Sequence, residues 1–155
     1  MMKRLYVIIV SLLLALPILA QYANTDQLFA AYSGREGYKT VVMGRKMIAM
    51  MQKESGGKSN VIDNIRQISI LSTEHSDSVL LNSARQLATQ DYELISMTNE
   101  NSEMTGFYIN ETAEDEKRFL MIAHREDEEV IMEIIGDFKI TDISKLSKLG
   151  TTGKK

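Results

Sequence analysis

Two histidines, His75 and His124, are the side chains of this sequence best suited to hold a metal ion. Zinc sites use His, Cys and carboxylate ligands, and because the chain has no Cys, such a site would need carboxylates. Glu74 and Asp77 lie near the first histidine, and Glu126 lies near the second. Nothing in the spacing brings the two groups together, and a His in a polar turn is usually a surface residue. We therefore predict no metal site and no cofactor.

Methionines form a second candidate group. Met43, Met47, Met50 and Met51 recur at i, i+4, i+7 and i+8, a spacing that gathers them on one stripe of a helix. Their thioethers could hold Cu(I). The same positions are those that a helix buries, however, and Met commonly fills gaps in cores. We therefore predict that the stripe packs into the core, with a copper site as the alternative.

Acidic side chains cluster in two places, at Glu126–Glu129 and at Glu114, Asp115 and Glu116. Calcium prefers such oxygen ligands. The alternating, Gly-containing loop of known calcium motifs is absent, and acidic turns are usually solvated. The sequence therefore predicts solvated turns.

The chain contains no recognisable catalytic motif. A Gly-x-Ser-x-Gly turn, a Gly-rich phosphate loop, and paired carboxylates at helical spacing beside a His are all absent. Lys58 beside Ser59 is interpreted as a chance neighbour. We predict no catalytic residues and no enzyme, although residues far apart in the sequence could still form an active site.

The first 20 residues have the layout of a secretory signal peptide. Lys3 and Arg4 precede an apolar run, which Pro17 ends shortly before Ala20. The run is shorter than the roughly 20 residues of a transmembrane helix. We therefore predict cleavage after Ala20 and an exported protein, periplasmic or extracellular, with no stable membrane insertion after cleavage; a retained anchor is the alternative.

Without this leader, 135 of the 155 residues remain, and the formal charge moves from −3 to −5 because Lys3 and Arg4 are lost. A mildly acidic chain is poorly suited to bind nucleic acid, which needs a concentrated positive surface. We predict one domain over residues 21–150, followed by a disordered tail at 151–155.

Helical and strand patterns alternate in the first half of the mature chain. We expect a short helix capped by Thr25 or Asp26, a strand at Tyr38–Met43, the methionine helix, a flexible loop at Lys53–Asn60, a strand from Ile65 to Ser72, and a helix at Asp77–Gln90. Four apolar runs then predict an antiparallel meander. They are Tyr92–Thr98, Met104–Asn110, Arg118–His124 and Glu129–Ile135, and a final helix begins at Thr141.

In the run Arg118–His124, apolar side chains occupy both faces of the predicted strand. Phe119, Met121 and Ala123 point to one face, and Leu120 and Ile122 point to the other, so this strand should be covered on both faces. The whole pattern predicts a single α+β domain, with helices packed on a mostly antiparallel sheet, a C-terminal four-strand meander and a final helix.

A family resemblance is carried by several of these features. They are Phe29 and Tyr32 followed by Gly37 and Val41, the methionine-rich helix, the strands Ile68–Leu71, Tyr92–Met97 and Val130–Asp137, and the following Ile143 and Leu146. With the signal peptide, they resemble the exported domain-of-unknown-function family 4252, which is typical of Bacteroidetes. The family has no established activity, so the resemblance implies no site residues. It implies a link to envelope signalling, through neighbouring extracytoplasmic sigma-factor genes.

Two short modification patterns remain. Asn110-Glu111-Thr112 fits the eukaryotic N-glycosylation pattern, and Asp77-Ser78-Val79 resembles the O-glycosylation motif of exported Bacteroidetes proteins. Both are short enough to occur by chance, and modification of the second stays open.

These features favour an exported, non-enzymatic module that binds or regulates another envelope protein. A carrier or sensor of a small apolar ligand is the alternative, and an undetected enzyme is the third hypothesis. An enclosed apolar pocket beneath the Met47 helix would favour the ligand, and a solid core would favour the protein partner. Lys53–Asn60 is the predicted contact loop, followed by the acidic turn at Glu126–Glu129. The oligomeric state stays open.

Overall fold

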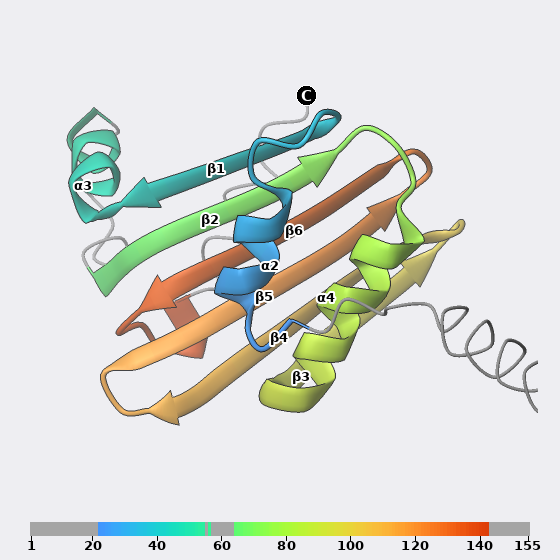
Figure 1. The fold of residues 1–155 in the computed structure, drawn as a ribbon. Helices are drawn as coiled ribbons and strands as arrows, with labels where there is room; N and C mark the ends of the chain where they lie inside the picture. The colour runs from blue at the N-terminus through green and yellow to red at the C-terminus, as the bar shows by residue number, and fades with distance from the viewer. Residues whose placement is uncertain (1–21, 55, 57–63, 143–155) are drawn as a thin grey trace, which may run out of the picture.

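The computed structural model of the chain describes residues 22–54, 56 and 64–142. These residues form one six-stranded antiparallel sheet with the strand order β1-β2-β6-β5-β4-β3, and they confirm the predicted α+β class (Figure 1). The elements are α2 (Thr25–Tyr32), β1 (Tyr38–Gly44), α3 (Arg45–Glu54), β2 (Ile65–Thr73), α4 (Ser78–Asp91), β3 (Glu93–Glu100), β4 (Glu103–Ala113), β5 (Glu116–Arg125) and β6 (Glu128–Gly136).

The C-terminal strands form the predicted meander: β3 pairs with β4, β4 with β5, and β5 with β6. β6 also pairs with β2, and β2 pairs with β1, so that β1 and β3 are the two edge strands of a continuous sheet. In β5, Leu120 and Ile122 pack on one face and Phe119 and Met121 on the other, which confirms the predicted two-sided strand.

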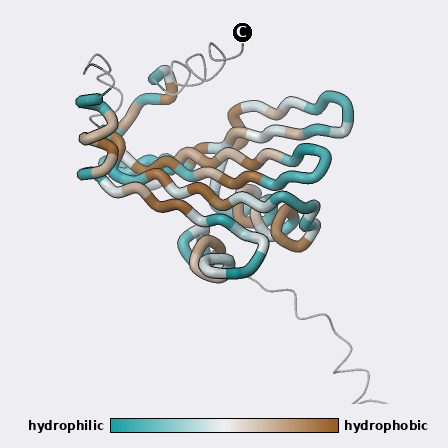
Figure 2. Tube along the Cα trace, turned by 90° about the horizontal axis from the view of Figure 1, so that it is seen from above, coloured by the Kyte–Doolittle hydropathy of each residue, from teal (hydrophilic) through white to brown (hydrophobic). Residues whose placement is uncertain are grey.

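Helices α2 and α4 lie side by side over one face of the sheet, which we call the front face (Figure 1). Hydrophobic residues lie along the middle of the strands, whereas the turns are mostly hydrophilic (Figure 2). The apolar cluster buried on the front face contains Leu28, Phe29, Tyr32, Leu71, Leu80, Leu81, Ala84, Leu87, Ala88, Met104, Tyr108, Leu120, Ile122 and Ile131. Both helices therefore bury one apolar stripe each, as expected of amphipathic helices on a sheet.

Side chains cap the N-termini of both helices on the front face. Asp77 caps α4, because its carboxylate accepts hydrogen bonds from the backbone N–H groups of Val79 and Leu80. The prediction of Thr25 or Asp26 as the cap of α2 is wrong. Asn24 is the cap, and the Thr25 hydroxyl instead binds a buried glutamate of β6.

The methionine helix does not pack as predicted. Met47, Met50 and Met51 are 51%, 60% and 51% exposed, and Ile48 is the buried residue of α3. The helix begins directly after β1, at the corner of the sheet (Figure 1), and extends past the strand ends. Because α3 does not lie across a sheet face, only Ile48 of its side chains is buried in the second apolar cluster. We call this cluster the rear apolar cluster, and its buried residues are Ile48, Ile65, Ile109, Phe119, Ile134 and Phe138. Met43 belongs to β1 instead and packs against that cluster.

Several predictions fall outside the described residues. They concern the leader at 1–20, most of the Lys53–Asn60 loop, the tail at 151–155 and the final helix beyond a helical turn that begins at Ile140. Among the described residues, no helix is long and apolar enough to span a membrane.

Candidate functional site

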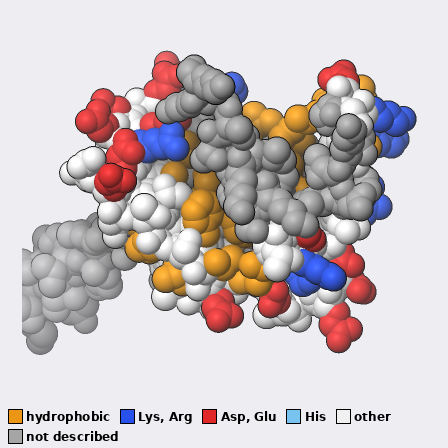
Figure 3. Space-filling view, turned by 180° about the vertical axis from the view of Figure 1, so that it is seen from behind, with side chains coloured by type: hydrophobic (Ala, Val, Ile, Leu, Met, Phe, Trp, Pro, Cys, Tyr) orange, Lys and Arg blue, Asp and Glu red, His pale blue; other side chains and the backbone are white. Residues whose placement is uncertain are grey.

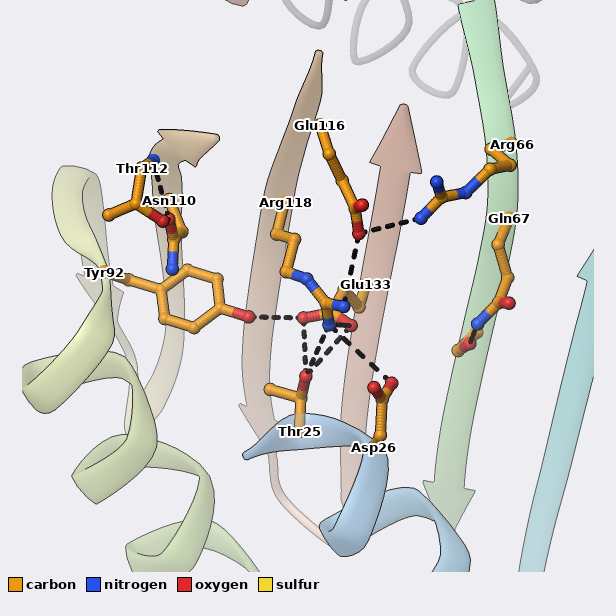
Figure 4. Close-up of polar contacts among 11 residues, drawn as sticks. Thr25, Asp26, Arg66, Gln67, Tyr92, Asn110, Thr112, Glu116, Arg118 and Glu133 are labelled. Atoms are coloured by element: carbon orange, nitrogen blue, oxygen red, sulfur yellow. Dashed lines mark hydrogen bonds and ion pairs between the residues drawn. The ribbon is translucent and has the colours of Figure 1, made fainter. Parts of the chain in front are cut away.

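A buried carboxylate, Glu133, lies on the front face of β6 beneath the two helices (Figure 4). It is 1% exposed. The Thr25 hydroxyl donates to its two oxygens at 2.9 and 2.8 Å, the Tyr92 hydroxyl donates a further hydrogen bond, and the Arg118 guanidinium lies 3.3 Å away. Thr25 is the first residue of α2, and Tyr92 is the C-cap that directly follows α4. This Glu133 cluster therefore joins both helices to the sheet.

The pKa shifts and ion pairs of the Glu133 cluster indicate that it supports the fold. Burial raises the pKa of Glu133, against the lowering effect of its hydrogen bonds and of Arg118. Burial and the adjacent carboxylate also raise the pKa of Tyr92. Arg118 extends the network to Glu116 at 3.3 Å, and Glu116 binds Arg66 at 2.7 Å. Because the protein's own side chains surround the carboxylate, its evident role is to position α2 and α4.

A second polar cluster lies at the start of α4. Besides capping the helix, Asp77 accepts a hydrogen bond from the Tyr38 hydroxyl. His75 Nε2 lies 3.3 Å from that hydroxyl, and His75 Nδ1 lies 2.6 Å from Thr73 Oγ1. Burial and the Asp77 carboxylate raise the pKa of Tyr38 to about 12. Gly37 packs against the histidine at a φ of +83°, and a Cβ there would lie 3.3 Å from the ring.

Glu129 connects the segment around each histidine: it contacts His124 in β5 and the backbone of Asp77, two residues after His75. Its Oε1 atom lies 2.7 Å from His124 Nδ1 and accepts a bond of 3.4 Å from the backbone N–H of Asp77. The two histidines do not bind the same carboxylate, because His124 contacts Glu129 whereas His75 contacts Thr73. No group of three His, Asp or Glu residues in the described ranges is arranged to hold a metal ion. The acidic turn is solvated at Glu126 and Asp127, but Glu129 is 1% exposed, so the prediction is wrong for that residue.

An open hollow of about 650 Å³ lies beside these residues. Its lining includes Gly37, Tyr38, Ser72, Thr73, His75 and Glu128. The Thr73 and His75 pair has the spacing of a nucleophile and its base. Thr73 is only 2% exposed, however, so an external substrate has little access to its hydroxyl.

Exposed apolar side chains gather at α3 and at the edge strand β3. In α3 they are Met47, Met50 and Met51, which we call the α3 methionine surface. All eight residues of β3 are exposed, including Leu94, Ile95 and Met97. A further apolar band crosses the rear face of the sheet (Figure 3), where Phe107, Met121 and Met132 are partly buried. The methionine spacing identified the α3 residues from sequence but not their exposure.

Sequence reasoning missed Glu133 and Glu129 as buried groups. Both stand in the strong apolar run of β6, at the alternate positions that also hold Ile131. Side chains of a strand alternate between its two faces, so a glutamate at a position that alternates with buried apolar residues is itself expected to be buried. This signal could have identified both glutamates, because a buried charge needs partners.

The comparisons with known proteins identify a family and no individual relative. The family model described as "Domain of unknown function (DUF4252)" matches residues 32–146, and the chain belongs to this family. No curated protein and no solved structure matches the chain.

Proposed function

We propose that this member of the DUF4252 family is an exported, non-enzymatic module that binds another protein of the cell envelope. The observation that carries this proposal is the α3 methionine surface. Three large apolar side chains on one short helix are at least half exposed, although the same helix has a buried position at Ile48. Exposed apolar groups that gather on one element are typical of a contact surface.

Methionine suits such a role because its side chain is unbranched and adapts to irregular partner surfaces. Arg45, Lys46 and Lys53 lie on the same helix and are exposed. A partner that fits α3 would therefore offer an apolar groove with acidic residues at its rim. The basic rim would guide association, and the methionines would supply the buried area.

The alternative is a carrier of a small apolar ligand, which would need an enclosed apolar pocket beneath α3. The methionines of this helix face outward, and Ile48 fills the contact with the rear cluster. This arrangement favours the protein partner. An enzyme has still less support, because the hydroxyl nearest to a histidine, that of Thr73, is buried.

Export is part of the proposal and rests on residues 1–20, which lie outside the described residues. The mature N-terminus is expected at Gln21, because Ala20 is the last small residue before the polar sequence begins. The mass of the protein recovered from its native cells tests this. A mass that still includes Met1 to Ala20 would indicate an anchored protein.

Photo-cross-linking in native cells tests the binding function. A photoreactive amino acid replaces Met50 in one variant and Glu36, an exposed residue in the α2 to β1 connection, in a matched control. We expect one envelope protein to be captured at position 50 and not at position 36. Native mass spectrometry of the protein from the same cells tests the alternative: a bound small molecule, without position-specific cross-links, would overturn the proposal.

A further inference from the structure

The two edges of the sheet carry opposite charge. Along residues 86–116, which include β3 and β4, there are eight Asp and Glu residues and no Lys, Arg or His. Along residues 35–46, which include β1, there are four Lys and Arg residues and one Glu. Lys39 in β1 and Glu93 and Glu100 in β3 are exposed, as are Arg45 and Lys46, the first two residues of α3, which follows β1 directly. Within the described residues, none of these five side chains has an ion pair. Among the described residues, each edge therefore carries charge that no ion pair neutralises.

Strand direction makes the two edges compatible. Every neighbouring pair in the sheet is antiparallel, so across six strands β1 and β3 run in opposite directions (Figure 1). A second copy placed beside the first in the same orientation would bring its β1 antiparallel to β3. The sheet would continue, and the helices of both copies would cover the same face.

The side chains also match in register. Val42 lies across from Ser69, which lies across from Glu133, so Val42 is on the front face. Met97 lies across from Gly106, which lies across from Ile122, so Met97 is on the front face as well. Val42 and Met97 are 59% and 44% exposed. Placed opposite each other, they form an apolar cross-strand pair.

This register also pairs opposite charges. At a distance of three residues along each strand from the pair of Val42 and Met97, Lys39 of one copy lies opposite Glu100 of the other. Opposite charges at such positions stabilise strand pairing, and like charges destabilise it. Pairing β3 with β3 in the register that aligns their ends would instead place Glu93 against Glu100. Pairing β1 with β1 would bring together two positively charged segments, because each copy has Lys39 in the strand and Arg45 and Lys46 directly after it. Charge therefore favours contact between unlike edges.

Edge strands are normally protected against such pairing by Lys, Pro or bulges. β3 has no Lys and no Pro. Its register shift lies between Leu94 and Ser96, near the start of the strand, so Ser96–Glu100 remains a regular edge. β1 carries one Lys, Lys39, whose charge Glu100 of the neighbouring copy would neutralise, and it has no register shift in its pairing with β2. Both edges are thus able to extend the sheet.

We propose that copies of this chain associate head to tail, with β1 of one copy added to β3 of the next through Val42 with Met97 and Lys39 with Glu100. Such a contact joins two different surfaces, and it leaves a free β1 edge and a free β3 edge at the two ends of the assembly unless the rotation between copies closes a ring. Without ring closure it produces a linear assembly, which the sheet twist turns into a helical ribbon. The α3 methionine surface is not part of this contact, so the proposal stands apart from the proposed function.

Sedimentation velocity on the mature chain tests the assembly. We expect the weight-average sedimentation coefficient to rise with protein concentration and to fall with added salt, which screens exposed charges. Lys39→Glu and Glu100→Lys should each weaken association at least tenfold. The double variant, and an equimolar mixture of the two single variants, should recover it because both restore the opposite pairing between copies.

Matched controls carry the same charge changes at exposed positions away from both edges, Lys139→Glu and Glu126→Lys. These variants should associate like the wild type, and circular dichroism should show that every variant is folded. A wild type that stays monomeric at all concentrations would overturn the proposal. So would association that Lys39→Glu and Glu100→Lys leave unchanged, or a double variant that does not recover.

Discussion

The front face of the sheet and the corner that holds α3 use helices in different ways. α2 and α4 each bury an apolar stripe, and the Glu133 cluster joins them to β5 and β6. α3 buries one residue, Ile48, and leaves three methionines in solvent. Burial stabilises a fold in proportion to the apolar area removed from water. Packing on the front face therefore contributes more to the stability of the described residues than α3 does, and the exposed methionines of α3 contribute little to it.

The largest expected effect concerns the Glu133 cluster. Glu133→Ala leaves Arg118, Tyr92 and Thr25 without their buried partner, and we expect a loss of about 4 kcal/mol in the free energy of unfolding. Urea denaturation measures this loss. Glu126→Ala, at an exposed glutamate of the β5 to β6 turn, is the matched control and should change stability by less than about 0.5 kcal/mol. Equal effects of the two substitutions would contradict the structural role of the cluster.

The next prediction compares an apolar side chain from each region. Leu80 of α4 is 0% exposed, and Met50 of α3 is 60% exposed. Leu80→Ala should cost about 3 kcal/mol because it leaves a cavity under α4. Met50→Ala should cost less than about 0.5 kcal/mol. A Met50→Ala variant that loses as much stability as Leu80→Ala would mean that α3 packs as tightly as the front face.

Two carboxyl groups of the front face should give pH effects of opposite sign. Burial opposes ionisation of Asp77, but hydrogen bonds from Tyr38 and from the start of α4 hold its pKa below 3.8. Its stabilising contribution is therefore present above pH 3.8 and is lost as the pH falls through the folded pKa. Burial raises the pKa of Glu133 above 4.5. Its contribution is present below pH 4.5 and is lost as the pH rises through the folded pKa.

Two isosteric variants separate these contributions. Asp77→Asn should cost about 1 kcal/mol at neutral pH and should reduce the loss of stability in acid. Glu133→Gln should flatten the decline in stability above pH 4.5. Urea denaturation across the acid and neutral range measures both. A Glu133→Gln variant with the same pH profile as the wild type would show that Glu133 does not titrate in this range.

The sequence predicted local patterns better than the placement of elements. The strands of the meander and the two-sided β5 followed from alternation, which reflects local backbone geometry. The pairing of β2 with β6 joins strands about 60 residues apart, between Leu71 and Ile131, and no local pattern encodes it. For the same reason, the methionine spacing predicted a shared stripe on α3 but could not show that the helix lies beyond the sheet. Glu133 was hidden because its partners come from α2, α4 and β5.

Methionine oxidation tests the role of α3 most directly. Hydrogen peroxide oxidises exposed methionines to sulfoxides, and mass spectrometry reports the extent at each position. A Glu36→Met variant supplies an exposed control position on the same molecule. The account predicts that Met47, Met50 and Met51 are oxidised readily in the purified protein and are protected in intact cells, while the methionine introduced at position 36 reacts equally in both. Equal oxidation of the α3 methionines in the two settings would contradict it.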